Sequence, residues 1–223
     1  MVELEQPSAT SPRLADVLGA LSLVTDIAAS VPSRPDKMKL EAQLAELAAL
    51  GLTLEPGVTV DDLLYFLGRK EYEEEPYKHL MGVFGTELES RPGQPVCRVV
   101  WFLDEEYVYE SDTYVGIVNR LAHMSGSTDR LTKVESELNL EEETGFLELT
   151  LDGKRHRRQV VVDNDWLDTR VLGYIMALLG SEDRRFYSMP DGGQGVLLFY
   201  VNDDTAGAIN RLMDYTLEPV VTR

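Results

Sequence analysis

The sequence has few of the side chains from which most recognisable active sites are built. Its 223 residues include one cysteine and three histidines, and His79, His123 and His156 stand far apart along the chain. Zinc motifs need closely spaced Cys and His ligands, and nucleophilic enzymes place Ser or Cys in a local context that is missing here. No catalytic residue can be named, we expect no cofactor, and a non-catalytic role is favoured over an enzymatic one.

Positive charge is also scarce. The chain has 21 Lys and Arg against 39 Asp and Glu, which gives a formal net charge of −18. A protein of this charge repels phosphate backbones, so we expect no direct binding of nucleic acid. The electrostatic complement of such a surface is a basic protein.

Long apolar runs are missing as well. No stretch approaches the ~18 apolar residues of a bilayer-crossing helix, and the first twelve residues lack the pattern of a signal peptide. The single cysteine, Cys97, lies in the apolar run VCRVVWFL and is expected to be a small buried side chain on a strand. A chain without an internal disulfide suits a reducing compartment, so we expect a cytoplasmic protein with no membrane contact.

The residues that are present predict an α+β protein whose first part, residues 1–92, is mainly helical. Apolar periodicity indicates one helix near Pro12 to Ser30 and another near Asp36 to Leu50. The second helix is expected to end at Gly51, a residue suited to the left-handed position that follows many helices. The two helices would form a hairpin.

A capping box and a proline then mark two further helix starts. Thr59 and Asp62 resemble a capping box, and the next helix is expected from Pro76 to Gly85. The acidic residues Glu73, Glu74 and Glu75 would precede that helix, where its dipole favours negative charge. The alternative is that these three carboxylates bind a partner.

The second part, residues 93–223, mixes strands and helices, and it is either a separate domain or continuous with the first part. We expect a buried strand in VCRVVWFL, a helix capped by Asp112, and a shorter helix over TDRLTKVESELN. Next comes a hairpin, because Asp152-Gly153 supplies the positive φ angles of a two-residue turn between GFLELTL and KRHRRQVVV. A helix follows this hairpin.

The order of two strands and a helix then recurs, with RRFYSM, the turn DGGQ, the strand GVLLFYV and a last helix. We predict two strand–strand–helix units that share one antiparallel sheet. The units are either a duplication or of independent origin, because Asx residues before a helix are also what N-capping requires.

The junction between the first hairpin and its helix holds the candidates for a metal site. Asp163, Asp165 and Asp168 offer carboxylate oxygens of the kind that Mg²⁺ or Ca²⁺ prefers, but their spacing is not that of an EF-hand. The competing interpretation is that Asp165 or Asp168 caps the helix. In that case Trp166 anchors the junction in the core.

The run KRHRR, Lys154 to Arg158, is a basic exception in this acidic chain. Side chains alternate along a strand, so these residues cannot all face a core. They protect an exposed strand edge from aggregation, neutralise nearby carboxylates, or bind phosphate.

The layout of EYEEEPYKHL, DNDWLD and DGGQGVLL is similar to that of uncharacterised bacterial proteins, and the acidic mixed architecture resembles bacterial immunity proteins that neutralise toxins. This resemblance implies a non-catalytic inhibitor of another protein. The partner would be basic, with a toxin as one candidate. The oligomeric state of this chain is open. The alternatives are a carboxylate-based metal-dependent enzyme and a nucleic-acid mimic.

Two clusters that mix carboxylates with tyrosine are the candidate partner-binding residues, because tyrosines can anchor an interface. The set comprises Glu73, Glu74, Glu75, Asp104, Glu105, Glu106 and Tyr107.

Overall fold

The computed structural model describes residues 37–190, 192–213 and 216–221, and these residues form the predicted α+β fold. The described helices are α2 (Leu40–Ala49), α3 (Val60–Phe66), α4 (Arg69–Glu74), α5 (Lys78–Phe84), α6 (Thr113–Ser125), α7 (Thr169–Leu179) and α8 (Asp203–Leu212). The strands are β1 (Val100–Asp104), β2 (Leu131–Asn139), β3 (Thr144–Leu151), β4 (Lys154–Val161), β5 (Arg185–Pro190), β6 (Gly195–Val201) and β7 (Glu218–Pro219). The helix expected over Pro12 to Ser30 lies outside the described residues.

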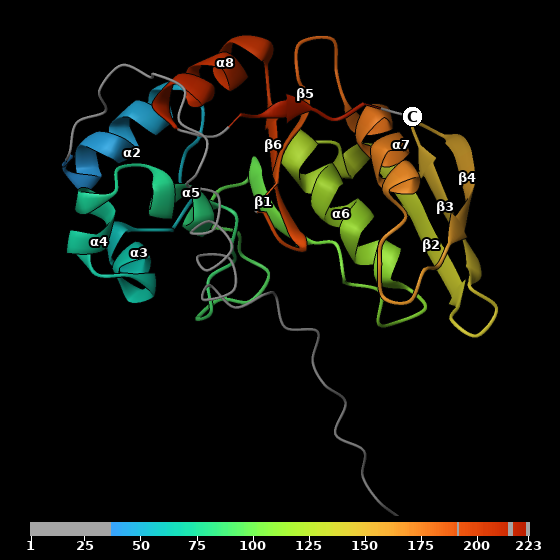
Figure 1. Cartoon of the computed structure of the whole chain (residues 1–223). Coiled ribbons are helices and arrows are strands. Elements are labelled where there is room, and N and C mark those ends of the chain that lie inside the picture. The colour runs from blue at the N-terminus through green and yellow to red at the C-terminus, as the bar shows by residue number, and fades with distance from the viewer. Residues whose placement is uncertain (1–36, 191, 214–215, 222–223) are drawn as a thin grey trace, which may run out of the picture.

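Two antiparallel sheets lie side by side with helices between them (Figure 1). One sheet has the strand order β1-β6-β5-β7, and the other is the meander β2-β3-β4. Helices α6 and α7 occupy the space between the sheets, whereas α2 to α5 are grouped on the far side of the first sheet. The buried apolar side chains form one cluster that runs from Leu40 in α2 to Leu217 before β7. The helical first part and the mixed second part therefore share a core.

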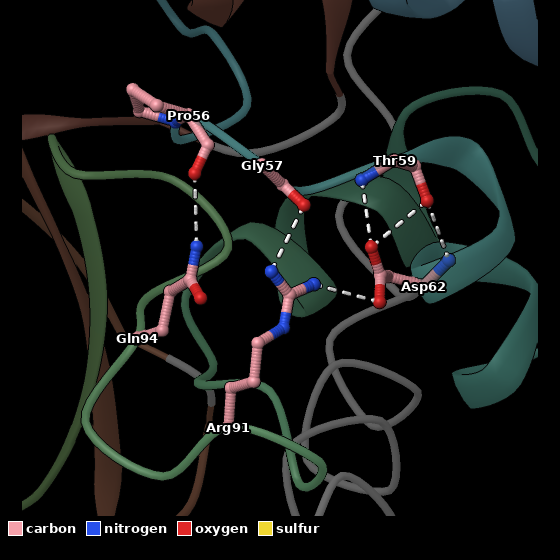
Figure 2. A network of polar contacts seen from close by, with 6 residues as sticks. All are labelled: Pro56, Gly57, Thr59, Asp62, Arg91 and Gln94. Carbon is pink, nitrogen blue, oxygen red and sulfur yellow. Dashed lines mark hydrogen bonds and ion pairs between the residues drawn. The ribbon is translucent and has the colours of Figure 1, made fainter.

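The first helices follow the local signals of the sequence. Helix α2 is followed by Gly51 at φ +88°, and the Thr59 side chain accepts from the Asp62 N–H while Asp62 accepts from the Thr59 N–H. This capping box is part of a larger polar network in Figure 2. Arg91 donates to the Asp62 carboxylate (2.8 Å) and to the Gly57 carbonyl (2.9 Å), so it ties the loop between α5 and β1 to the start of α3.

The helix expected from Pro76 begins later and is preceded by another. Helix α4 already covers Arg69–Glu74, and α5 starts at Lys78 because Tyr77 has φ +68°, a conformation that no helix continues. Glu73, Glu74 and Glu75 consequently lie at the C-terminal end of α4, so the prediction that they stabilise a helix N-terminus is wrong. The end of α5 at Gly85 is confirmed.

Both predicted hairpins are present, each followed by a helix. Strands β3 and β4 flank the turn at Asp152 (φ +50°) and Gly153 (φ +75°), and β5 and β6 flank the glycine-rich turn. The prediction that the hairpins share a sheet is wrong, because β3 pairs on its other side with β2, and β6 pairs with β1. The segment 131–139 that forms β2 was expected to be helical, and pairing with β3 along its whole length overrides that preference.

Close backbone approach explains where β1 lies. The Phe102 N–H donates to the Gly85 carbonyl (2.9 Å), and a Cβ at Gly85 would stand 2.9 Å from the Phe102 nitrogen.

Cys97 is buried as expected, although it precedes β1, and burial raises the pKa of its thiol to about 12. No helix among the described residues is both long and apolar enough to cross a membrane.

Candidate partner-binding surface

Two acidic loops that are far apart in the sequence lie side by side. One loop, residues 104–110, follows β1, and the other, residues 163–168, precedes α7. Their main chains are joined because the Val108 N–H donates to the Asp165 carbonyl (2.9 Å) and the Leu167 N–H donates to the Glu105 carbonyl (2.8 Å). The structure therefore unites the predicted partner-binding residues 104–107 with the predicted metal candidates of 163–168.

We call a set of exposed and partly exposed residues of these two loops the acid–aromatic surface. Its residues are Asp104, Glu105, Glu106, Tyr107, Tyr109, Glu110, Asp163, Asp165 and Trp166. Four of its carboxylates, those of Glu106, Glu110, Asp163 and Asp165, make no ion pair with any Lys, Arg or His of the described residues. The negative charge of these four carboxylates is thus not neutralised by a neighbouring cation of the described residues.

Short-range hydrogen bonds hold the first loop in shape. The Asp104 carboxylate accepts from the Glu106 N–H (3.0 Å), and the Tyr109 hydroxyl donates to the Glu106 carbonyl (2.7 Å). The Glu105 N–H donates to the Gln194 carbonyl (2.8 Å) in the turn between β5 and β6. Because the backbone is fixed at these points, the surface does not have to be ordered when a partner binds.

Two of the three aromatic side chains of the surface are open to solvent. Tyr109 is 63% exposed and Trp166 is 38% exposed, whereas Tyr107 is half-buried and contacts Tyr109 edge-to-face with 5.9 Å between ring centroids. Burial and the neighbouring carboxylates, Glu110 first among them, raise the pKa of Tyr107. Both tyrosines are therefore neutral donors at physiological pH.

Trp166 is not the buried anchor that the sequence suggested. The adjacent residue, Leu167, is 4% exposed and takes that role, since neighbouring side chains of an extended segment point to opposite sides. The isolated bridge between Glu106 and Trp166 holds the tryptophan at the junction of the two loops. It is available for contact with another molecule.

Asp168 belongs to the framework beneath the surface. Its carboxylate caps α7 through the Arg170 N–H (3.1 Å), accepts from the Val161 N–H (3.1 Å), and forms an ion pair with the Arg170 guanidinium (2.9 Å). Burial alone would raise the pKa of Asp168, but the Arg170 side chain and these two N–H groups outweigh it and hold the pKa below its ordinary value. The capping interpretation is confirmed for this residue.

The metal candidates do not converge. Asp168 is engaged as described, and Asp163 accepts a hydrogen bond from the Asn164 side chain (3.2 Å). Within the part of the chain that the structure describes, no group of three or more His, Cys, Asp or Glu side chains is arranged to hold a metal ion.

The other predicted cluster, Glu73 to Glu75, lies elsewhere and is neutralised. Glu73 and Glu74 form ion pairs with Arg69 (3.7 Å) and Lys37 (3.0 Å), and Glu75 pairs with Lys78 (2.5 Å). Helix α4 and helix α7 stand on opposite sides of the first sheet in Figure 1. The structure therefore does not combine Glu73 to Glu75 with the acid–aromatic surface.

A groove that sequence reasoning missed adjoins this surface. It has a volume of about 330 Å³ and lies between α7 and the first sheet, and Leu103, Val196 and Leu198 are among the residues that line it. Glu105 is common to the groove and the acid–aromatic surface. No sequence signal could reveal the groove, because its walls come from strands and a helix that meet only in the folded chain.

Comparisons of this chain with family models, with curated proteins and with solved structures find no match.

Proposed function

We propose that this chain is a non-catalytic protein that captures a basic protein partner, in the manner of bacterial immunity proteins and protein inhibitors. A toxin is one candidate partner, and the cytoplasm is the proposed compartment. The observation that carries the proposal is the convergence of the two acidic loops, 104–110 and 163–168, onto one surface with exposed Tyr109 and Trp166.

Physical reasoning connects this surface to protein capture. Carboxylates without local counter-charges attract a basic partner over several ångströms and speed its association, an effect that salt screens. Tyr and Trp side chains are frequent anchors of interfaces, because they bury a large area at a small loss of rotamer freedom. The net charge of −18 adds a favourable field of the same sign.

A metal-dependent enzyme is a weaker alternative, since the described residues include no cluster of ligands that would support it. A nucleic-acid mimic would also bind a basic protein. Competition with DNA distinguishes the mimic from the inhibitor proposed above. DNA displaces a mimic from its target, whereas an inhibitor of another kind is unaffected.

The test compares two charge-reversal variants with equal changes in net charge. The first changes Glu106, Asp163 and Asp165 to Lys, and the control changes the exposed Glu141, Glu142 and Glu182 to Lys. Wild type and variants are immobilised, exposed to the proteins of the native host, and then studied by salt-dependent kinetics with the captured protein. We expect the control to retain the partner and the first variant to lose it, with association that slows as salt rises.

Two further measurements separate specific capture from simple charge attraction. Trp166→Ala should weaken capture without altering its salt dependence, because this change removes contact area and no charge. An unrelated cationic protein such as cytochrome c should bind much more weakly than the partner. If wild type holds nothing more tightly than cytochrome c, or if both charge variants hold the same proteins, the proposal is wrong.

A further inference from the structure

Strand β4 is the outer strand of the sheet β2-β3-β4, and its backbone groups alternate between two directions. The register pairs Leu151 with Lys154 across the two-residue turn, and the Val162 N–H, eight residues after Lys154, donates to the Glu143 carbonyl (3.1 Å). Even-numbered residues therefore turn their N–H and C=O groups toward β3. The Val161 N–H points the other way, to the Asp168 carboxylate (3.1 Å).

It follows that Arg155, Arg157 and Gln159 direct their N–H and C=O groups away from the sheet. None of these three N–H groups donates a hydrogen bond to any of the described residues. Pairing with β3 is regular over Thr144–Val161, without a bulge, and β4 has no proline. Figure 1 shows β4 at the rim of the molecule, with no labelled element beyond it. The Arg157 carbonyl already accepts from the Arg158 guanidinium (3.2 Å), so it is the outward N–H groups that are open. A regular strand edge with open N–H groups is a template for another strand.

The side chains along this edge are basic. Arg155 and Arg157 both contact the carboxylate of Glu148, which lies opposite on β3 and is only 5% exposed. On the other face, Arg158 stacks on Tyr174, with its guanidinium carbon 3.7 Å from the ring centroid. Lys154 and Arg158 form no ion pair with a described carboxylate. Because one buried carboxylate serves several cations, the edge has a surplus of positive charge.

We propose that the edge of β4 accepts an extended acidic segment of another protein as a fourth, antiparallel strand of this sheet. In such a pair the residue opposite Arg157 presents its side chain on the same face as Arg157. Acidic residues at alternate positions of the incoming strand would therefore pair with Arg155 and Arg157. The interaction uses a different surface and the opposite charge from the acid–aromatic surface, so it does not depend on the function proposed above.

A second copy of this chain fits the edge less well. Antiparallel pairing of two β4 strands centred on Arg157 would set Arg157 opposite its own copy and His156 opposite Arg158. Like charges that face each other across a strand pair are destabilising. Charge complementarity thus selects an acidic strand over self-association.

The test is a titration of the isotope-labelled full chain with a synthetic peptide, acetyl-Thr-Glu-Thr-Glu-Thr-Glu-Thr-amide, followed by amide NMR. The same peptide with Lys in place of Glu is the charge control. We expect the acidic peptide to shift the amide signals of Arg155, Arg157 and Gln159 and to slow their hydrogen exchange. The amides of His156 and Arg158 already bond to β3 and should keep their exchange rates.

Two changes isolate the backbone contribution. Gln159→Pro removes one outward N–H and no charge, and should weaken binding about fivefold to tenfold, the effect of losing about one hydrogen bond. Methylating the peptide nitrogens that face β4 should abolish binding, whereas methylating those that face away should not, and this comparison leaves the protein unchanged. Arg157→Gln should weaken binding and reduce its dependence on salt.

The proposal is overturned if millimolar acidic peptide leaves the three amides unaffected, or if the Lys peptide binds equally well. Binding that is indifferent to the position of the methyl groups would also overturn it, because only side-chain charge would then be involved. If the three amides are unaffected, or if the position of the methyl groups makes no difference, the arginines of β4 act solely to keep the edge from pairing. A dimer of the free chain, detected by sedimentation, would replace the acidic strand with a second copy.

Discussion

At the scale of single residues, Arg120 shows how a buried cation can serve structure. It lies on α6 and donates to the carbonyls of Val100 (3.0 Å), Arg98 (3.4 Å) and Cys97 (3.5 Å). A guanidinium nitrogen also stands 3.2 Å from His123 Nδ1, and Nε has no partner among the described residues. Burial lowers the pKa of Arg120. Its donors bond to three carbonyls at the start of β1 and just before it.

Replacing Arg120 by Met should lower the free energy of unfolding by about 2–3 kcal/mol, because the carbonyls of Val100, Arg98 and Cys97 would lose a charged donor. Equilibrium denaturation in urea measures this loss. The control is Arg98→Met, whose exposed side chain lies nearby and should cost less than about 0.5 kcal/mol. Similar losses for both variants would contradict the role assigned to Arg120.

At the scale of elements, the end of β4 and the start of α7 are joined by one carboxylate. Asp168 accepts from the Val161 N–H of the strand and from the Arg170 N–H of the helix, and its own N–H donates to the Tyr114 hydroxyl of α6 (2.7 Å). A helix cap, a strand end and a neighbouring helix therefore meet at this residue. The acid–aromatic surface rests on this junction.

Asp168→Ala should cost about 2 kcal/mol of stability, near the upper limit for a helix cap, because the Val161 N–H loses its acceptor as well. Asp168→Asn keeps a capping oxygen and should cost less. Thermal and urea unfolding of both variants measure the losses, with Asp163→Ala as the control near zero. A large effect of the Asp163 change would show that the loop, and not the cap, holds the junction.

At the scale of the whole molecule, the three histidines link stability to pH. Burial lowers the pKa of His79, His123 and His156 from the ordinary value of 6.5, with Arg120 adding to the effect on His123 and Lys154 and Arg158 on His156. In the unfolded chain each histidine binds its proton near pH 6.5. Protonation therefore favours the unfolded state as the pH falls below that value.

We expect the free energy of unfolding to decrease from pH 7.5 to pH 5.5, relative to a variant with Gln at all three histidine positions. The sign follows because the folded state binds fewer protons than the unfolded state over this interval. Urea unfolding at a series of pH values measures both slopes. The comparison of slopes removes the contribution of the carboxylates, which both proteins share. Equal slopes would contradict the predicted shifts.

Local signals in the sequence identified much of the fold. The capping box of Thr59 and Asp62, the left-handed Gly51 and the Asp152-Gly153 turn were all predicted and are present. Each of these features depends on residues within a few positions of one another. The carboxylates of Asp104 to Glu106 were also recognised from sequence as a candidate contact, although their partner-binding role stays a prediction.

Contacts between distant segments determine how these pieces are combined. They place the two hairpins in different sheets, make a strand of residues 131–139, and turn Trp166 outward. They also join loop 104–110 to loop 163–168 and separate both from Glu73 to Glu75. The physical reason is that caps and tight turns are satisfied by neighbours in the chain, whereas strand pairing and exposure depend on which distant edges and faces meet.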